Sequence, residues 1–341
     1  MPVTIGLMGF GRIGRNIFRI AYDRSDIRVG AISDIADPEA LTYLLRYDTI
    51  LGRFPDKITY KDGYLYTIGK EIPFLSGRDP GDVDWSAYGV DYVIEATARD
   101  RPLADFRKHI DSGARRVVLC VPTTDKPDRS IVFGVNDEKL RQNDLIISNA
   151  SCTAHCAAPV LKILSDAFAI EQVHLTSVHA FTSVQRLADV PAHELRMSRA
   201  AAMNIVPSDT NAGHVIEEVL PRLAGRIHAS ALRVPVPNGS IVDMTIGFKE
   251  DISAGRINEV VRTAAAGPYS DILEFAEDPI VSSDVAVCPY SSVYDSLATM
   301  VLEDRIGKVI AWFDNSWGYS HRVVDLVFRC AAMDGLIEEG T

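Results

Sequence analysis

Cysteine is scarce in this chain of 341 residues: there are only five, an odd number. Sparse cysteine argues against a disulfide-stabilised secreted scaffold and favours reduced thiols in the cytoplasm. The chain also lacks a basic opening followed by an apolar stretch, so we expect no secretory signal. No apolar run approaches the roughly 18 to 20 residues of a membrane span, so we expect no membrane association.

Positive charge is in deficit, with 35 Lys and Arg against 46 Asp and Glu and a net charge of -11. Nucleic-acid backbones are bound by clustered Lys and Arg, so we expect no nucleic-acid partner. The balance still allows a small anionic substrate held by a few local arginines. No internal repeat or low-complexity linker is visible, and the length suits two domains of ordinary size.

The first half alternates strand and helix patterns. A buried strand is predicted by "VTIGLMGF" and a helix by "GRIGRNIFRIAYDR". Further short apolar runs with turn residues at their ends are "IRVGAISD", "VDYVIEATA", "RRVVLCVP" and "DLIISNA". Continuous rather than alternating hydrophobicity indicates parallel strands covered on both faces. The pattern predicts an α/β, doubly wound nucleotide-binding domain up to about residue 150.

The second half changes character. Longer runs rich in β-branched and aromatic residues are "EQVHLTSVHAF", "HASALRVPVP", "SIVDMTIGF" and "KVIAWFDN". These predict a mostly antiparallel sheet with a few helices, such as "NEVVRTAAAG". The polar segment 182–207 is long enough to be a functional or interface loop. The final "HRVVDLVFRCAAMDG" has a helical period, and we expect this helix to pack on the first domain.

A glycine-rich turn joins the first predicted strand to the first predicted helix. In "GFGRIG", Gly9 permits a tight turn, Gly11 lets the backbone approach a pyrophosphate, and Gly14 lets helix and strand pack closely. The helix N-terminus then offers N–H groups to phosphate. Asp34 ends the second strand, where a carboxylate accepts both ribose hydroxyls of NAD and repels the extra phosphate of NADP. The alternative is an ordinary glycine turn with a surface Asp.

The stretch "SNASCTAHC" (148–156) follows an apolar strand, so Cys152 is predicted near the start of a helix. A helix N-terminus lowers a thiol pKa, and a nearby imidazole lowers it further. His179, at the end of a predicted strand, is the candidate base. A thiolate beside a nicotinamide suits attack on an aldehyde and hydride transfer to NAD. The acyl-thioester left behind is then released by a nucleophile.

Two other interpretations of these residues remain open. Free cysteines are most often buried packing residues, and we assign that role to Cys156. A zinc site built from Cys152, His155 and Cys156 would need further ligands, and the sequence has no second CxxC or HxxxH pair. We therefore expect no metal.

Taken together, "GFGRIGR", "SNASCT", "LRVPVPN" and "WFDNSWGYS" resemble the phosphorylating glyceraldehyde-3-phosphate dehydrogenase family, as do "GVDYVIEAT", "RAAAMNIVP" and "VSSDV". The similarity runs through essentially the whole chain in the family's order. It implies a Rossmann NAD-binding domain from residues 1–150 plus 317–341 and an α+β catalytic domain from residues 151–316. It also implies a homotetramer, in which the loop at 181–206 reaches toward the neighbouring subunit's cofactor site.

The resemblance also implies roles for individual residues. Cys152 would be the nucleophile, and His179 would activate it and act as acid or base, with the Cys152 amide and the imidazole stabilising the oxyanion. The substrate-binding positions are Thr182 and Arg233 for the C3 phosphate, Arg196 for the substrate-anion region, and Ser151, Thr153 and Thr210 for inorganic phosphate. The cofactor positions are Arg12, Ile13, Asp34, Arg78 and Thr97, with Asn315 orienting the nicotinamide carboxamide and Tyr319 beside the ring.

The chain departs from the family pattern at Met8, Ala98, Arg99, Cys120, Ala154, His155, Asn211 and Ser316. Of these, Cys120 belongs to the nicotinamide site and Asn211 to the phosphate site beside Thr210. The departures leave Cys152, His179 and Arg233 in place, so dehydrogenase chemistry is still expected. A weakened phosphate site would favour hydrolysis of the thioester over phosphorolysis.

The sequence therefore predicts NAD-dependent oxidation of glyceraldehyde 3-phosphate with inorganic phosphate, by a cytoplasmic enzyme. Two alternatives remain: an erythrose-4-phosphate or other non-phosphorylating phosphoaldehyde dehydrogenase, and a non-catalytic NAD-binding redox or partner protein. Thr182 in "HAFTSVQR" favours the glyceraldehyde-type enzyme over the erythrose-type one.

Overall fold

A computed structural model describes residues 2–121, 123, 125–183 and 185–338. The chain divides into two compact units, each described here by itself. Unit 1 comprises residues 1–131, 139–149 and 320–341, and unit 2 comprises residues 132–138 and 150–319.

The described residues of unit 1 form a nine-stranded sheet in the order β10–β11–β9–β8–β1–β2–β7–β6–β5. The strands from β10 to β7 pair in parallel, and β6 and β5 add an antiparallel edge. The strand bounds are β1 Val3–Met8, β2 Ile27–Ser33, β5 Thr59–Lys61, β6 Tyr64–Thr67, β7 Lys70–Leu75, β8 Tyr92–Glu95, β9 Arg116–Leu119, β10 Arg129–Ser130 and β11 Ile146–Ser148.

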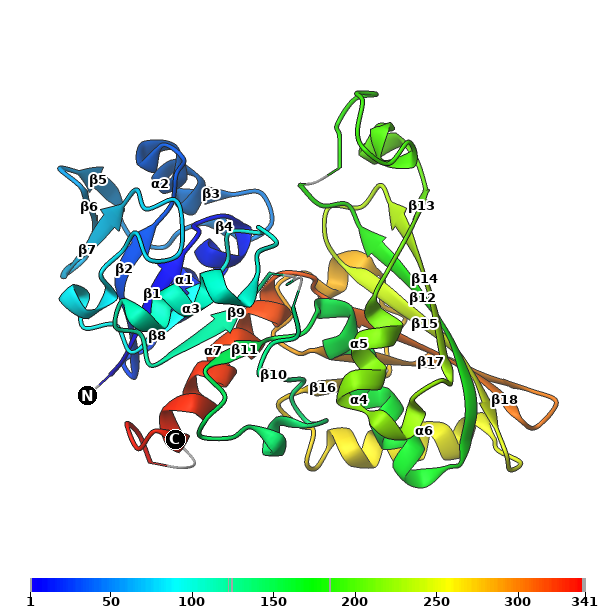
Figure 1. Cartoon of the computed structure of the whole chain (residues 1–341). Helices are drawn as coiled ribbons and strands as arrows, with labels where there is room; N and C mark the ends of the chain where they lie inside the picture. Colours follow the sequence, from blue (N-terminus) through cyan, green and yellow to red (C-terminus); the bar gives the residue numbers. More distant parts are fainter. Residues whose placement is uncertain (1, 122, 124, 184, 339–341) are drawn as a thin grey trace. The chain divides into compact units, whose positions relative to one another are not determined.

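Three α-helices connect these strands in the part of unit 1 before Asn149, as Figure 1 shows for α1 and α3. Their bounds are α1 Arg12–Tyr22, α2 Pro38–Arg46 and α3 Leu103–Asp111, and the short elements are β3 Tyr47–Asp48, β4 Gly52–Arg53, η1 Trp85–Tyr88 and η2 Asp137–Lys139. Every residue of β1, β8 and β9 is buried, as expected for central parallel strands covered on both faces. The predicted parallel architecture is confirmed.

The described part of unit 2 contains a seven-stranded sheet in the order β13–β14–β12–β15–β18–β17–β16. Strands β12 and β14 pair in parallel, as do β16 and β17, and the other four pairings are antiparallel. The bounds are β12 Ile170–Ala180, β13 Val206–Ser208, β14 Ile227–Val234, β15 Ser240–Phe248, β16 Leu273–Ala276, β17 Ser292–Leu302 and β18 Ile306–Phe313. A mostly antiparallel sheet was predicted and is confirmed.

Three helices lie against one face of this sheet: α4 Cys152–Ala167, α5 Ala212–Val219 and α6 Ala254–Ala265. Strand β15 alternates strictly between buried and half-buried residues, so one of its faces turns toward these helices. Helix α4 supplies the centre of the core, where Cys156, Val160 and Leu164 are fully buried. The remaining helical segments are η3 Arg196–Ser198, η4 Ala201–Met203, η5 Pro221–Leu223, η6 Ser282–Val285 and α7 Trp317–Met333, which continues into unit 1.

Segment 132–138 belongs to unit 2, although the sequence analysis placed all of 1–150 in the first domain. Val132 and Val135 are buried in the hydrophobic core of unit 2. The Tyr269 hydroxyl also donates a hydrogen bond to the carbonyl oxygen of Gly134. Packing therefore places this short segment in unit 2. Its own sequence does not differ from the apolar runs around it, so the assignment could not be made from the sequence.

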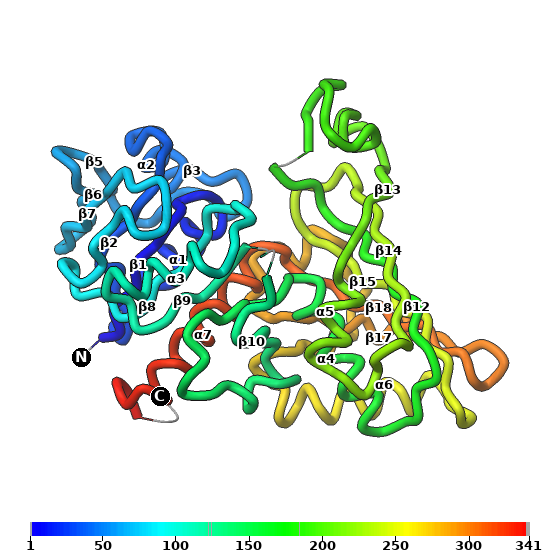
Figure 2. Tube along the Cα trace, in the orientation of Figure 1, coloured from blue at the N-terminus to red at the C-terminus, as the bar shows by residue number. Residues whose placement is uncertain are grey.

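The long segment between β12 and β13 leaves the end of β12 and returns through the short turns η3 and η4 (Figure 2). It exposes several large apolar side chains, among them Leu187, Leu195 and Met203. Across the described ranges of the chain, no helix combines the length and apolar character needed to cross a membrane.

Candidate functional site

The carboxyl ends of four neighbouring parallel strands in unit 1 bring together residues predicted to contact a dinucleotide. Strands β9, β8, β1 and β2 are adjacent in the sheet and parallel. Cys120, Thr97, Gly9 and Asp34 lie just beyond the ends of these strands, in that order across the sheet. Open α/β sheets bind ligands at this edge, where connections from a central strand leave in opposite directions.

The three glycines of the first turn occupy three different environments. A Cβ on Gly9 would lie 2.6 Å from the carbonyl carbon of Ala96, and one on Gly14 would lie 2.2 Å from the carbonyl oxygen of Gly9. A Cβ on Gly11 would meet no described atom within 4 Å. Gly9, which has φ +96°, and Gly14 are therefore required by the fold, whereas Gly11 leaves space open at the N-terminus of α1.

Asp34 is held by backbone donors on both of its carboxylate oxygens. Phe10 N–H donates to Oδ2 at 2.6 Å, and Ala36 N–H donates to Oδ1 at 2.9 Å. A carboxylate has about four acceptor positions, so Asp34 retains capacity for two hydroxyl donors. The open space at Gly11, the N-terminus of α1 and this carboxylate together fit the pyrophosphate and ribose of NAD. Arg12 and Ile13 occupy the first turn of α1.

A buried hydrogen-bonded chain supports Thr97. Trp85 Nε1–H donates to His109 Nδ1 at 3.0 Å, so the proton of His109 is on Nε2, which faces Glu95 Oε2 at 3.2 Å. Glu95 Oε1 accepts hydrogen bonds from both the N–H and the hydroxyl of Thr97. Because its proton is committed to Glu95, the Thr97 hydroxyl presents acceptor lone pairs to its surroundings.

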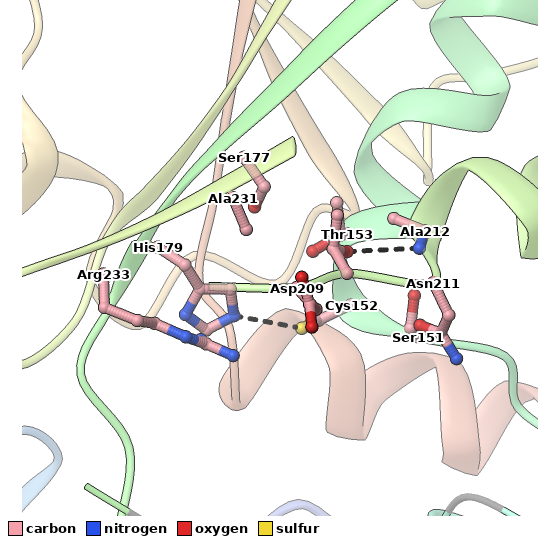
Figure 3. A pocket seen from close by; sticks show the side chains of 11 residues that line it. Ser151, Cys152, Thr153, Ser177, His179, Asp209, Asn211, Ala212, Ala231 and Arg233 are labelled. Atoms are coloured by element: carbon pink, nitrogen blue, oxygen red, sulfur yellow. Dashed lines mark hydrogen bonds between the residues drawn. The ribbon is translucent and has the colours of Figure 1, made fainter. Parts of the chain in front are cut away.

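In unit 2, residues from four segments of the chain line a cavity of about 540 Å³ (Figure 3). The lining residues are Ser151, Cys152, Thr153, Ser177, His179, Asp209, Thr210, Asn211, Ala212, Ala231 and Arg233. Seven of the residues singled out from the sequence are therefore brought together here, although Ser151 and Arg233 lie far apart in the chain.

The sequence around Cys152 explains why its thiol faces this cavity. Ala150 has a left-handed backbone with φ 48°, an unusual conformation for a residue with a Cβ, and it turns the chain sharply after β11. Ser151 then caps helix α4, with its Oγ accepting a hydrogen bond from Ala154 N–H at 3.1 Å. Cys152 is the first residue of α4, where backbone N–H groups have no partner inside the helix.

Cys152 and His179 form the central pair of the cavity. The sulfur of Cys152 lies 3.6 Å from Nε2 of His179. Nδ1 of His179 lies 2.7 Å from the carbonyl oxygen of Ala180, which can only accept, so Nδ1 carries the proton. Nε2 is therefore the unprotonated nitrogen, and its lone pair faces the thiol as a base would.

Burial shifts the pKa of both members of the pair toward the uncharged form. Burial, followed by the charge of Arg233, lowers the pKa of His179 to about 4. Burial raises the pKa of Cys152 above its ordinary value, although Arg233 and hydrogen bonds from Thr153 act in the opposite direction. The expectation of a lowered thiol pKa is wrong, because desolvation of the thiolate outweighs Arg233 and the hydrogen bonds at the helix N-terminus.

Strand register places a cation beside the pair. His179 on β12 is the direct partner of Arg233 on the parallel strand β14, two positions beyond the pair formed by Ser177 and Ala231. Nε and Nη1 of Arg233 are buried and find no hydrogen-bond partner among the described residues. A buried guanidinium with unused donors is typical of an anion site, since leaving such donors unpaired is costly.

Helix α5 begins at the same cavity. Thr210 Oγ1 accepts a hydrogen bond from Ala212 N–H at 3.1 Å, and Asn211 is the N-cap residue of the helix. The N-termini of α4 and α5 therefore both contribute to the lining, which favours negatively charged ligands.

The other predicted site residues lie outside this lining. Thr182 and Arg196 belong to the long segment after β12, with Thr182 N–H bonded to Gln185. Asn315 Oδ1 accepts from the Ser240 hydroxyl at 3.4 Å, and the ring of Tyr319 lies edge-on to that of His155, with centroids 6.0 Å apart. Arg78, in unit 1, is an exposed residue whose backbone N–H binds Asp82.

Sequence reasoning missed Ser177, Asp209 and Ser240. The alternation of a strand could have identified Ser177, which shares a face of β12 with His179. Asp209 directly precedes Thr210, and nothing in the local sequence indicates a role for it in binding. Ser240 connects the backbone of Ala180 to Asn315, a contact that depends on the pairing of β12 with β15 and carries no local signal.

Cys156 and His155 have structural environments. The Cys156 sulfur lies 3.7 Å from Ser292 Oγ and 3.8 Å from the carbonyl oxygen of Trp312, and burial strongly raises the pKa of its thiol. His155 is buried against Tyr319. Over the part of the chain that the structure describes, no three His, Cys, Asp or Glu residues gather as metal ligands would.

A dinucleotide-binding edge and a cysteine–histidine pair with a cation define a class of protein: dehydrogenases that use a nicotinamide cofactor and a cysteine nucleophile. The comparisons agree with this class. Residues 3–101 match the NAD binding domain, and residues 151–315 the C-terminal domain, of glyceraldehyde 3-phosphate dehydrogenase.

Relatives with that name extend along nearly the whole chain. Glyceraldehyde-3-phosphate dehydrogenase of Mycobacterium leprae is 44% identical over 334 residues, covering 96% of this chain and 98% of the relative. The enzyme of Borreliella burgdorferi is 44% identical over 331 residues, covering 95% and 98%. Glyceraldehyde-3-phosphate dehydrogenase 2 of Bacillus subtilis is 43% identical over 333 residues, covering 97% and 98%. The chain belongs to the glyceraldehyde-3-phosphate dehydrogenase family.

Proposed function

We propose that this protein oxidises glyceraldehyde 3-phosphate to 1,3-bisphosphoglycerate, with NAD as oxidant and inorganic phosphate as the acyl acceptor. The observation that carries the proposal is the 3.6 Å contact between the Cys152 sulfur and the unprotonated Nε2 of His179, in a cavity with an unpaired Arg233. A nucleophile, a base and an anion-binding cation are thus assembled in one place.

Acylation begins with a neutral pair. As the Cys152 sulfur bonds to the aldehyde carbon, the thiol proton passes to Nε2 of His179, and a hemithioacetal forms. The Nδ1–H bond to Ala180 keeps the ring oriented while it carries this proton. The low pKa of His179, about 4, makes the imidazolium a strong acid that protonates the developing oxyanion.

When bound, NAD would supply the acceptor for the hydride of the hemithioacetal carbon, so that Cys152 is left with a thioester. The proton of the hemithioacetal hydroxyl returns to His179 in that step. An oxygen of inorganic phosphate then bonds to the thioester carbon, and the carbon–sulfur bond breaks to restore the thiol after it regains a proton. His179 is thus used as a base and as an acid in turn.

The anionic groups of the two substrates have separate sets of partners in this proposal. Arg233 and Thr182 would bind the C3 phosphate of the aldehyde, and Arg196 would lie in the substrate-anion region. Ser151, Thr153 and Thr210, at the N-termini of α4 and α5, would bind inorganic phosphate. Asn211 would lie beside that phosphate. Arg233 gives the strongest support for a separate site for the C3 phosphate, since two of its buried N–H groups have no hydrogen-bond partner among the described residues.

In this proposal NAD binds at the carboxyl ends of the parallel strands in unit 1. Gly9, Gly11 and Gly14 with the first turn of α1 would hold the pyrophosphate, and Asp34 the adenosine ribose. The other contacts in this proposal are Arg12, Ile13, Arg78, Thr97, Cys120, Asn315 and Tyr319. Residues 1–150 with 317–341, apart from the segment 132–138 that packs in unit 2, would thus form the NAD-binding domain, and residues 151–316 the catalytic domain.

A substrate panel tests this function. Purified protein with NAD should form NADH rapidly from glyceraldehyde 3-phosphate only when phosphate is present. Erythrose 4-phosphate as the much better substrate, or a rate indifferent to phosphate, would overturn the proposal. No turnover on any phosphorylated aldehyde, with all cysteines equally reactive toward iodoacetamide, would leave a non-catalytic NAD-binding protein instead.

We extend the proposal to assembly and location: a homotetramer in the cytoplasm. The exposed Leu187, Leu195 and Met203 support a subunit contact, because several large apolar side chains exposed on one segment are typical of an interaction site. Light scattering on the purified protein should give four chains per particle, and a monomeric mass would contradict the assembly.

A further inference from the structure

Asp209 introduces a negative charge into a cavity that is otherwise built for anions. It is the acidic side chain among the eleven lining residues, and Figure 3 shows it between His179 and Asn211 in that view. The same lining contains Arg233 and the N-termini of α4 and α5. A bare anion there would be attracted by these groups and repelled by Asp209.

Nothing within the described ranges neutralises this carboxylate. Asp209 is exposed to the cavity and forms no hydrogen bond or ion pair with any described residue. The N–H of Ala212 is occupied elsewhere, since it donates to Thr210 Oγ1 as helix α5 begins. The carboxylate of Asp209 is thus an acceptor without a donor, two residues before the N-terminus of a helix.

A ligand satisfies all these groups only if it is an anion that also carries a proton. Inorganic phosphate at neutral pH keeps at least one P–O–H group, whereas sulfate, of the same shape, has none. The unprotonated phosphate oxygens would accept from the helix N-termini and nearby hydroxyls, while P–O–H donates to Asp209.

We propose that Asp209 is a specificity-determining residue that selects a protonated tetrahedral oxyanion, hydrogen phosphate, over unprotonated ones such as sulfate. The inference rests on the proposed function, because it concerns the acyl-accepting anion of that reaction.

Steady-state kinetics of the full-length protein test this. Phosphate is varied at saturating NAD and glyceraldehyde 3-phosphate, so that the aldehyde occupies its own anion subsite, and sulfate is added as inhibitor. For the wild type, the Ki of sulfate should exceed the KM of phosphate by about tenfold to a hundredfold, the range of one hydrogen bond to a charged group. In Asp209→Asn and Asp209→Ala this ratio should fall to about one.

The Asn variant has a carbonyl oxygen that still accepts from phosphate and an amide that now donates to sulfate, so its KM for phosphate should change little. The Ala variant tests whether the carboxylate merely repels anions. If it does, Asp209→Ala should bind phosphate and sulfate more tightly to the same extent, and the ratio of the sulfate Ki to the phosphate KM should stay as in the wild type. Asp278→Asn, an exposed carboxylate outside the cavity lining, is the control for a general change in charge and should behave as wild type.

An unchanged ratio in both Asp209 variants would overturn the inference, as would a wild type that binds sulfate as tightly as phosphate. A second readout needs no turnover: phosphate should protect Cys152 from iodoacetamide better than sulfate does in the wild type and equally well in Asp209→Ala. A protein without phosphate-dependent NADH formation that still shows this protection pattern would sink the proposed function and leave the inference standing.

Discussion

Each of the two units contains a buried histidine beside a reactive or acidic partner. The two histidines differ in how many of their ring nitrogens are hydrogen-bonded. In unit 1, His109 is bonded through both ring nitrogens, to Trp85 and to Glu95, and Glu95 is bonded in turn to Thr97. In unit 2, His179 uses one ring nitrogen on the Ala180 carbonyl and directs the other at a thiol.

The difference distinguishes the supporting hydrogen-bonded network of unit 1 from the reactive site of unit 2. A buried polar chain in which every member is satisfied fixes the side chains it contains and leaves them nothing to offer a ligand. The cavity of unit 2 instead holds groups with spare capacity: the Nε2 lone pair of His179, two donors of Arg233 and the carboxylate of Asp209. Unused bonding capacity, and not burial alone, therefore marks the reactive site.

The largest effect should come from removing the base. We expect His179→Asn to lower kcat/KM for the aldehyde by about a hundredfold to ten-thousandfold, because the thiol proton then has no acceptor. NADH absorbance provides the rate. His174→Asn, an exposed histidine on the same strand, is the matched control and should have wild-type activity.

The same variant should change how stability depends on pH. The pKa of His179 is about 4 in the folded protein against an ordinary 6.5, so the unfolded chain binds this proton first as the pH falls. The free energy of unfolding of the wild type should therefore drop between pH 6.5 and pH 4, and His179→Asn should reduce that drop by roughly 2 to 3 kcal/mol. Urea unfolding at pH 7 and pH 4.5 measures both; equal losses in the two proteins would mean that His179 is not buried neutral.

Replacing the cation should weaken substrate binding. Arg233→Gln removes a charge-assisted partner of the phosphate, so we expect the KM for glyceraldehyde 3-phosphate to rise about tenfold to a hundredfold. Arg262→Gln, at an exposed arginine paired with Glu277, is the control. An unaltered KM would show that the unpaired donors of Arg233 do not face the substrate.

Cofactor choice should shift when Asp34 is shortened. In Asp34→Ala the ribose loses its acceptor and the 2′-phosphate of NADP loses a repulsive neighbour, so the preference for NAD over NADP should fall by about tenfold. Initial rates with each cofactor give the ratio. Asp34→Asn keeps the size and one acceptor and should fall in between; a preference that stays the same in both variants would assign specificity to other residues.

The smallest effect on catalysis should come from the satisfied network. Trp85→Phe removes the donor to His109 Nδ1 and should cost about 1 to 3 kcal/mol of stability through an unpaired buried acceptor. Its kcat and its KM for the aldehyde should equal those of the wild type. A loss of kcat at full folding would break the distinction between the two units.

Much of the fold could be predicted because its central elements carry local signals. The apolar run of β1 and the glycines after it identify a parallel strand followed by a helix, and "SNASC" identifies the start of α4. The edge strands β5 to β7 were not predicted, since their residues are mixed and pairing with β2 and its neighbours orders them. Helix α2 was also not predicted, although Asp37 as its N-cap and Pro38 in its first turn are local signals for a helix start.

The sequence predicted which residues form the candidate site but not the direction in which the pKa of Cys152 shifts. The residue types of Cys152, His179 and Arg233 indicate chemistry on their own, but their proximity depends on the parallel register of β12 with β14. The sign of the Cys152 pKa shift depends on how deeply the thiol is buried, which no local pattern states. Asp209 was overlooked for the same reason, because a loop acid matters only once the cavity around it exists.

The central claim is that Cys152 carries the acyl group while His179 takes its proton. The most direct test mixes the protein with NAD and glyceraldehyde 3-phosphate in the absence of phosphate and examines the intact and digested protein by mass spectrometry. The account predicts a burst of about one NADH per active chain and one matching acyl adduct, located on the peptide that contains Cys152. NADH formed without an adduct, or an adduct on another cysteine, would contradict it.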